Sequence, residues 1–183
     1  GDWKFNWVRS PEDRPMDFYD PNFDDDNWTD FPVPANWEIN GFGIPIYVNI
    51  PYEFTSAPDP PDIPDGYNPV GSYRHRFNIP NDWLDRRIVL HFGAVKSAFY
   101  LWINGEKVGY SQGSKLPAEF DITDFVRSGK NNLAMEVYRW SDGSFLECQD
   151  FWRISGIERD VYLVAEPKIR IGDFWVKTPL NDT

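Results

Sequence analysis

The 183-residue sequence has very little cysteine and histidine, and it contains no long hydrophobic run. Cys148 is the single cysteine, so a disulfide within the chain and a cysteine-rich metal site are both excluded. The two histidines, His75 and His91, have no third metal-ligating residue nearby in sequence, and we expect both to be structural. No apolar stretch approaches the roughly 20 residues that a membrane-spanning helix requires, so we expect no membrane partner.

Basic residues are also scarce, with 18 lysines and arginines against 29 acidic residues, which gives a net charge of −11. Such a surface repels nucleic acid and anionic lipid, so neither is expected as a partner. The opening residues Gly1–Phe5 have neither the basic start nor the apolar stretch of a signal peptide. We expect this opening to lie inside a longer protein. The hydrophobic fraction of 41% is enough for a core.

Patterns of long amphipathic helices are absent, and short strand patterns take their place. The dipeptide Asn104-Gly105 separates an apolar run from a second strand pattern, which predicts a hairpin with a type I′ turn. Alternation or strong apolar character predicts strands over these segments: Tyr73–Ile79, Arg87–Phe92, Ala98–Ile103, Lys107–Tyr110, Leu133–Trp140 and Val161–Val164. Many short strands with turns between them predict an all-β fold, an antiparallel β-sandwich of the jelly-roll type.

Two stretches are predicted to be irregular. Asp17–Pro34 is acidic and rich in turn residues, and its Asp24–Asp26 run lacks the glycine and distal glutamate of a calcium loop. We expect that run to be a solvated turn on which Trp28 packs. Pro51–Pro69 contains six prolines, too many for a ladder strand because proline donates no backbone hydrogen bond. A loop of this length is expected to be functional or packed against another part of the protein.

The domain organisation follows from a change of pattern near the end of the chain. Glu166-Pro167 closes the last sandwich strand, so residues 1–167 are predicted to form one domain. Lys168–Thr178 then begins a new alternation of apolar residues. We expect residues 168–183 to be a linker and the truncated first strand of a following domain.

The segment Arg139–Asp160 combines carboxylates, arginines and aromatic rings in a chain that is 17% aromatic. Carboxylates and arginines in an aromatic wall suit the hydroxyl groups of a sugar. The same composition also suits a turn whose charges pair locally and whose rings fill a core. Composition alone favours this second interpretation and leaves both open.

The order of residues in this segment resembles a signature of the long bacterial β-galactosidases of glycoside hydrolase family 2. There Arg-Trp-Ser-Asp-Gly-Ser is followed by Leu-Glu-Asp-Gln-Asp, and here Arg139–Ser144 is followed by Leu146-Glu147-Cys148-Gln149-Asp150. Further blocks match in the same order, and the resemblance covers essentially the whole chain: Pro34–Trp37 with Pro45–Tyr47, Asn68–Tyr73, and Phe99–Phe120.

The resemblance implies a galactose-binding-domain-like jelly roll, followed by an immunoglobulin-like domain. It implies that Asn49 and Asp150 bind substrate in the galactose subsite and that Asp150 also binds a sodium ion. It places no catalytic residue in this chain, because both catalytic glutamates of the family lie in a downstream (β/α)₈ barrel. The resemblance implies sodium and magnesium as cofactors of the full-length parent. It implies no cofactor for this chain alone. Cys148 departs from the family, which often has Asp at this position.

Three functions are compatible with the sequence. The first is an accessory domain of a retaining β-galactosidase, with a β-galactoside and the barrel as partners. The parent is then expected to be homo-oligomeric and to lie in the bacterial cytoplasm or periplasm. The alternative is a stand-alone carbohydrate-binding module. The third is a small hydrolase that uses Glu147 and Asp150 as its carboxylate pair.

Overall fold

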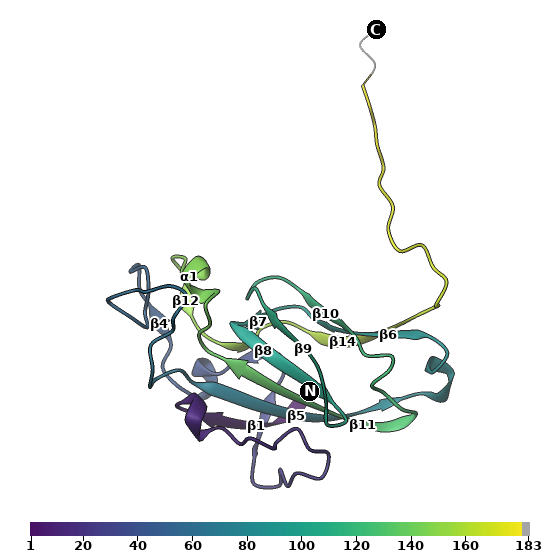
Figure 1. Cartoon of the computed structure of the whole chain (residues 1–183), viewed down its shortest axis with the longest axis horizontal. Helices are drawn as coiled ribbons and strands as arrows, with labels where there is room; N and C mark the ends of the chain where they lie inside the picture. Colours follow the sequence, from purple (N-terminus) through teal and green to yellow (C-terminus); the bar gives the residue numbers. More distant parts are fainter. Residues whose placement is uncertain (181–183) are drawn as a thin grey trace.

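The computed structural model describes residues 1–180, and nearly all of its regular structure is antiparallel strand (Figure 1). The larger layer is a six-stranded sheet, ordered β2 (Thr29–Pro32), β1 (Asp2–Val8), β5 (Val70–Ile79), β11 (Gly129–Tyr138), β8 (Ala98–Ile103) and β9 (Glu106–Gln112). The facing layer is a three-stranded sheet, ordered β10 (Ala118–Asp121), β6 (Arg87–Phe92) and β14 (Val161–Glu166). The predicted all-β antiparallel sandwich is therefore confirmed.

Smaller elements complete the fold, and α1, β12 and β4 lie near one end of the sandwich (Figure 1). One group is a three-stranded sheet ordered β3 (Ala35–Asn36), β13 (Gly156–Ile157) and β7 (Val95–Lys96), and another is the two-stranded ladder of β12 (Trp152–Arg153) with β4 (Ile46–Tyr47). The helical turns are η1 (Pro11–Asp13), η2 (Glu38–Asn40), η3 (Asn81–Trp83) and α1 (Ser144–Glu147). No helix within residues 1–180 has the length and apolar character needed to cross a membrane.

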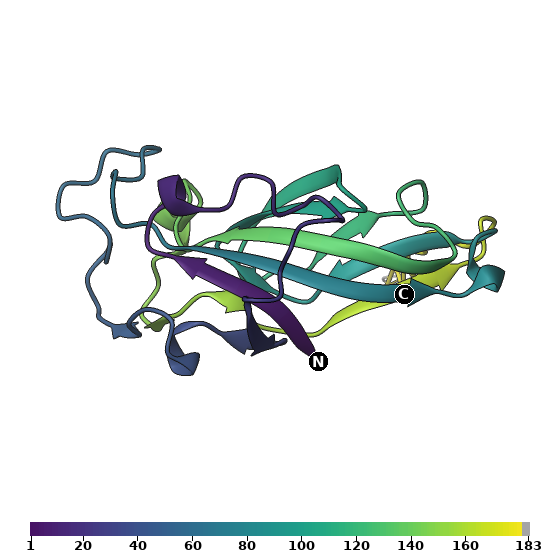
Figure 2. The same ribbon diagram turned by 90° about the horizontal axis from the view of Figure 1, so that it is seen from below.

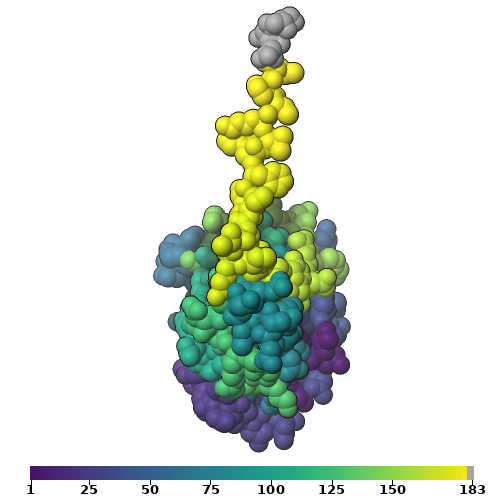
Figure 3. Space-filling model, turned by 90° about the vertical axis from the view of Figure 1, so that its right-hand side faces the viewer, coloured from purple at the N-terminus to yellow at the C-terminus, as the bar shows by residue number. Residues whose placement is uncertain are grey.

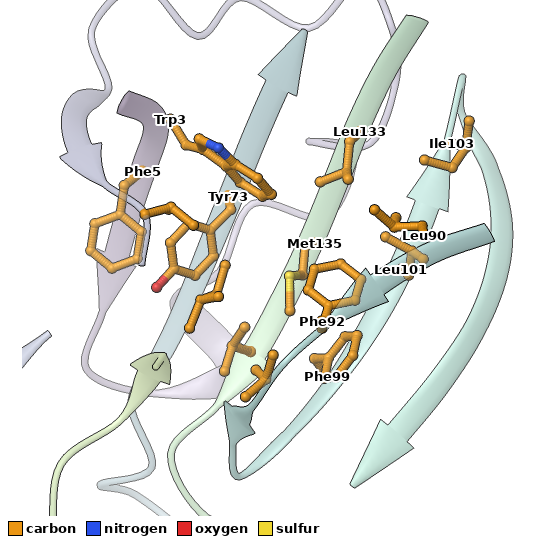
Figure 4. Packing of buried hydrophobic residues seen from close by; sticks show 14 of the residues in the cluster. Trp3, Phe5, Tyr73, Leu90, Phe92, Phe99, Leu101, Ile103, Leu133 and Met135 are labelled. Carbon is orange, nitrogen blue, oxygen red and sulfur yellow. The ribbon is translucent and has the colours of Figure 1, made fainter. Parts of the chain in front are cut away.

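The core lies between the two large layers and follows the two-residue period of the strands (Figure 4). In β8, Phe99, Leu101 and Ile103 are buried, whereas Tyr100 and Trp102 face the other side of the sheet. Buried side chains of neighbouring strands lie opposite one another, as Tyr73 lies opposite Met135. Full burial of one such side chain contributes about 1.5–3 kcal/mol.

The predicted hairpin between β8 and β9 is confirmed. Asn104 and Gly105 both have positive φ angles, 53° and 90°, as a type I′ turn requires. The Asn104 side chain also donates to the carbonyl of Phe125 at 2.9 Å and so ties the turn to the next loop. Strand β1 was not among the predicted strands, although its Trp3 and Phe5 alternate with polar residues and are buried.

The acidic turn was predicted to be solvated, and for Asp25 this is wrong. Asp24 and Asp26 are exposed, but only 3% of Asp25 is exposed. Its carboxylate accepts from Arg74 Nε at 2.7 Å and from Arg76 Nη2 at 3.1 Å. Burial is possible because two guanidinium groups replace the lost water, and these groups come from a strand far away in sequence.

Both histidines make contacts with protein side chains, which supports their structural role. His75 stacks on Trp3 with ring centroids 4.7 Å apart, and burial lowers the pKa of His75. His91 hydrogen-bonds Glu119 at 2.9 Å and stacks on Tyr162.

Residues 168–180 leave the sandwich at the end of β14 and extend away from it (Figures 1 and 3). Their apolar side chains are exposed, among them Ile169, Phe174 and Trp175. No strand within the described residues pairs with this segment. The assignment of residues 168–183 to a following domain stays a prediction, and its last three residues lie outside the described part of the chain.

Candidate functional site

The β4–β12 ladder brings the two sequence-predicted sugar-binding residues to the same end of the sandwich (Figure 1). Its register pairs Tyr47 with Trp152 and Ile46 with Arg153. Asn49 follows Tyr47 by two positions and Asp150 precedes Trp152 by two, so the residues occupy matching positions beyond the ladder. Both are exposed. The family signature and the Pro-Ile-Tyr block are therefore neighbours in space although they are far apart in sequence.

An aromatic pair marks the ladder. The rings of Tyr47 and Trp152 lie 5.4 Å apart at 44°, and these residues are 58% and 55% exposed. Aromatic rings of this size are among the side chains that contribute most to binding, because they bury a large apolar area on contact. The pair offers apolar surface beside the polar side chains of Asn49 and Asp150.

A buried ion pair fixes the loop that carries Asn49. Arg153 is 2% exposed in its side chain, and its Nη1 lies 3.7 Å from Glu53 Oε2. Glu53 Oε1 accepts from Trp140 Nε1 at 3.0 Å, and Arg153 Nη2 donates to the Ile50 carbonyl at 3.4 Å. Glu53 belongs to the proline-rich loop. That loop is therefore packed against the signature segment, as its length predicted.

A second buried pair joins Arg139 to Glu38. Arg139 Nη1 lies 3.2 Å from Glu38 Oε1, and Arg139 Nη2 donates to the carbonyls of Ile44 and Arg153 at 3.1 Å each. Oε1 has a charged neighbour but no hydrogen bond of good geometry, whereas Oε2 accepts from the Ser155 amide at 2.8 Å. Removal of the carboxyl group from water raises the pKa of Glu38, and the charge of Arg139 offsets only part of this effect. Arg139 thus joins β12, through the Arg153 carbonyl, to the segment just before β4, through the Ile44 carbonyl.

Basic groups collect around Phe151, the ring next to Asp150. Lys96 Nζ lies 4.8 Å from the ring centroid, and Lys115 Nζ and the Arg153 guanidinium each lie 5.4 Å away. Burial lowers the pKa of Lys96, and the negative charge of Glu53 works against this shift. The site thus combines a carboxylate with a local group of cations in a chain that is acidic overall.

Glu147 has a structural partner. Its Oε1 accepts from the Ser114 amide at 2.8 Å, and its Oε2 accepts from the Ser114 hydroxyl. Ser114 thus holds both carboxyl oxygens of Glu147 in one orientation through its own backbone and side chain, which is what a structural carboxylate requires. The contacts therefore argue against the pairing of Glu147 with Asp150 as catalytic carboxylates.

The family departure at Cys148 has a local electrostatic explanation. Cys148 Sγ lies 3.7 Å from Glu53 Oε2, and burial together with this carboxylate raises the pKa of the thiol. An aspartate at this half-buried position would place a second negative charge next to the buried Glu53 side chain, which is unfavourable. A neutral thiol avoids that repulsion.

The implied sodium ion can obtain one side-chain ligand at this place. Hard cations bind several oxygen atoms at once, and an exposed carboxylate such as Asp150 is a suitable one. Within residues 1–180, no group of three or more histidine, cysteine, aspartate or glutamate residues could hold a metal ion. The other ligands would have to be backbone oxygens, water or groups outside this chain, and the same holds for magnesium.

Comparison with known proteins identifies the family. Residues 1–167 match the family model described as "Glycosyl hydrolases family 2, sugar binding domain". This chain belongs to glycosyl hydrolase family 2. The resemblance found in the sequence is therefore confirmed. Among the curated relatives of this family 2 domain, a beta-galactosidase of Vibrio cholerae is 49% identical over 181 residues, which cover 99% of the chain and 17% of the relative.

Other relatives give the same picture. A beta-galactosidase of Priestia megaterium is 45% identical over 184 residues, covering 100% of this chain and 18% of its own length. A solved Bacteroides uniformis beta-glucuronidase matches with a TM-score of 0.66 and 28% identity, over 90% of this chain and 17% of that one. The family 2 domain thus spans less than a fifth of each of these three relatives. Its relatives act on more than one sugar by name, so membership in the family does not fix the sugar.

Sequence reasoning missed Glu38 and Glu53, the acidic partners of the two buried arginines. Glu38 directly follows the Pro34–Trp37 block, and Glu53 stands between aromatic residues in the proline-rich loop. Their places beside these sequence blocks were the only sign in the sequence that they matter. Neither block indicates which arginine each glutamate pairs with.

Proposed function

We propose that this domain forms one wall of the galactose subsite of a β-galactosidase that hydrolyses terminal β-D-galactosides with retention. The observation that carries the proposal is the β4–β12 ladder, which holds Asn49 and Asp150, both exposed, at matching positions of the same end. The chemistry is suitable, because an amide donates to one hydroxyl and accepts from another. A carboxylate accepts strongly from hydroxyl groups and can also bind a sodium ion.

The domain also braces the catalytic (β/α)₈ barrel of the parent chain. Around the ladder lie Ile44, Ile50 and the Tyr47–Trp152 pair, and each of these residues is at least half exposed. Clustered apolar side chains with polar groups beside them are typical of surfaces that pack against another domain. The two ion pairs beneath them give this surface a fixed shape.

The domain alone lacks the chemistry for hydrolysis. Retention requires two carboxyl groups about 5–5.5 Å apart, one as nucleophile and one as acid and base. Glu147 is engaged by Ser114, which leaves Asp150 as the exposed carboxylate of the Leu146–Asp150 part of the signature. We therefore expect no measurable turnover of a chromogenic β-galactoside by the 183-residue chain. Turnover that survives Asp150→Asn would point to a catalytic centre elsewhere on the chain.

The decisive experiment is Asp150→Asn in the full-length parent. The substitution keeps the shape of the side chain but removes its charge, and a charge-assisted hydrogen bond is worth about 1.5–3 kcal/mol. We expect kcat/KM to fall at least about tenfold, with a weaker dependence on sodium and little change in stability.

Asp142→Asn is the matched control. Asp142 is exposed in the preceding turn, where its carboxylate accepts from the Gly143 amide at 2.8 Å. We expect this variant to retain activity and its response to sodium. If Asp142→Asn abolished both while Asp150→Asn left them intact, the assignment within the signature would be wrong.

A stand-alone carbohydrate-binding module is the second candidate, and the exposed Tyr47–Trp152 pair favours it. Half a subsite offers few hydrogen bonds, and the entropy lost on association offsets much of their contribution. We expect millimolar or weaker binding of galactose to the isolated chain by calorimetric titration. Micromolar affinity would favour the module.

A further inference from the structure

A separate hollow of about 340 Å³ lies on the outer face of the six-stranded sheet. It shares no lining residue with the site around Asn49 and Asp150. Its walls are the following side chains of β8, β9, β11 and the segment between β1 and β2: Arg14, Met16, Phe18, Tyr19, Tyr100, Trp102, Lys107, Glu136 and Tyr138. This volume lies at the lower end of the range of about 300–1,000 Å³ that is typical of small-molecule sites.

Strand register builds the floor. Tyr100 of β8 lies between Glu136 of β11 and Tyr110 of β9, so the three residues form one row across the outer face. The neighbouring row places Trp102 opposite Lys107. These positions face outward because the alternate residues of β8 fill the core.

The segment between β1 and β2 crosses this outer face and supplies the wall (Figure 2). Tyr19 stacks on Trp102 with centroids 5.4 Å apart and an angle of 7°. Arg14 Nε lies 3.3 Å from Glu136 Oε2. The sheet and the segment are thus joined by a ring stack on one side and an ion pair on the other, and the hollow lies between them.

The floor contains a carboxylate that is buried but still has acceptor positions left. Glu136 is 5% exposed; its Oε1 accepts from the Tyr138 hydroxyl at 2.5 Å, and Arg14 faces its Oε2. A carboxylate has about four acceptor positions, so these two contacts leave about half of them. Burial and the hydrogen bond to Glu136 raise the pKa of Tyr138, so its hydroxyl stays protonated as a donor.

Arg14 supplies the complementary donors. A guanidinium has five N–H groups, and the contacts of Arg14 use Nε toward Glu136 and Nη1 toward the Pro11 carbonyl. A carboxylate beside a guanidinium offers acceptors and donors to adjacent hydroxyl groups. Rings beside such a pair offer apolar surface to the C–H faces of a pyranose. An anionic ligand is disfavoured, because Glu136 already places a negative charge in the floor.

A simpler interpretation is that the Arg14–Glu136 pair only anchors the segment to the sheet. Anchoring accounts for the ion pair, but it does not require an open hollow beside the partly exposed rings of Tyr19, Tyr100 and Trp102. Lys107 covers Tyr100 with its Nζ 4.1 Å from the ring centroid, and its exposed, flexible side chain can move aside. We propose that this hollow is a second saccharide-binding site, for a neutral hexopyranoside unit, independent of the site at Asn49 and Asp150.

The test is a titration of the 183-residue chain with lactose, followed by ¹H–¹⁵N NMR. Because few polar contacts are available, we expect a Kd of about 1–10 mM, with shifts at the Tyr100 and Trp102 amides and the Trp102 indole. Arg14→Met removes the guanidinium donors and leaves Glu136 without its cation, and we expect it to weaken binding here about tenfold; unchanged amide signals from the core strands check that the fold is kept. Tyr100→Ala should abolish the shifts. Asp150→Asn should leave them unchanged, which separates this site from the proposed galactose subsite.

Three outcomes would overturn the proposal. One is the absence of shifts at Tyr100 and Trp102 up to about 100 mM lactose, roughly ten times the largest Kd expected. Another is binding at these residues that neither Arg14→Met nor Tyr100→Ala weakens. The third is a set of shifts that depends on protein concentration without sugar, which would make the hollow a contact between two copies of the chain.

Discussion

Arg139→Met is expected to be among the most damaging single substitutions near the candidate site. Arg139 is almost fully buried, and it contacts Glu38 at 3.2 Å and the carbonyls of Ile44 and Arg153 at 3.1 Å. Methionine keeps the apolar part of the side chain but leaves the Glu38 carboxylate buried without a cation. Breaking one side of a buried ion pair costs about 3–5 kcal/mol, a large part of the roughly 5–15 kcal/mol that stabilises a typical domain.

The loss should depend on pH in a definite direction. Burial already raises the pKa of Glu38 above its ordinary value of 4.5, and removal of Arg139 takes away the charge that lowers it. A carboxyl group whose pKa is higher in the folded state adds stability below its unfolded pKa, and this stability is lost as pH rises through the folded pKa. We therefore expect a larger loss at pH 8 than at pH 5, because the lower pH favours the uncharged form of Glu38 in the variant.

Urea unfolding followed by tryptophan fluorescence measures both effects. Arg159→Met is the matched control, because Arg159 is exposed and should change the free energy of unfolding by no more than about 0.5 kcal/mol. In the double variant Arg139→Met/Glu38→Gln, removal of the unpaired charge should recover part of the loss. A loss below about 1 kcal/mol for Arg139→Met, or the same loss at both pH values, would refute the reasoning.

Three further predictions concern stability and use the same urea assay. Asp25→Asn leaves Arg74 buried without a charged partner and should lower the free energy of unfolding by about 3–5 kcal/mol. Asp24 is exposed, so Asp24→Asn should lower it by less than about 0.5 kcal/mol. Equal losses for the two variants would contradict a stabilising role of the buried Asp25–Arg74 pair. Gly71→Ala puts a Cβ 2.7 Å from Phe5 Cε2 and also too close to the Trp37 ring, so the free energy of unfolding should fall by at least about 1–3 kcal/mol. Gly172→Ala is the control and should have no effect, because no atom lies within 4 Å of the added Cβ. Lys96→Met removes a buried ammonium whose pKa burial lowers; it should stabilise the chain by about 1 kcal/mol at pH 7. This gain should shrink as pH rises toward the ordinary pKa of lysine, because the wild-type penalty disappears there, and a gain that grew with pH would oppose this account.

The strands, the hairpin and the family were predictable because their signals are local. In β8, Phe99, Leu101 and Ile103 alternate with Tyr100 and Trp102, so the two-residue period alone assigns one set to the core. Asn104-Gly105 is specific because few residues tolerate positive φ at both turn positions. The signature at Arg139–Ser144 and Leu146–Asp150 needed only the order of residues along the chain.

Only the tertiary structure decided which charges are buried and with which partners. Asp25 looked like its exposed neighbours, and its burial depends on arginines of β5. The neighbourhood of Asn49 and Asp150 depends on the register of β4 with β12, and the saccharide hollow depends on a segment that crosses the outer face of the sheet. A local pattern records which face of a strand a residue occupies. It does not record the distant group that approaches that face, and the energy of a buried charge depends on that group.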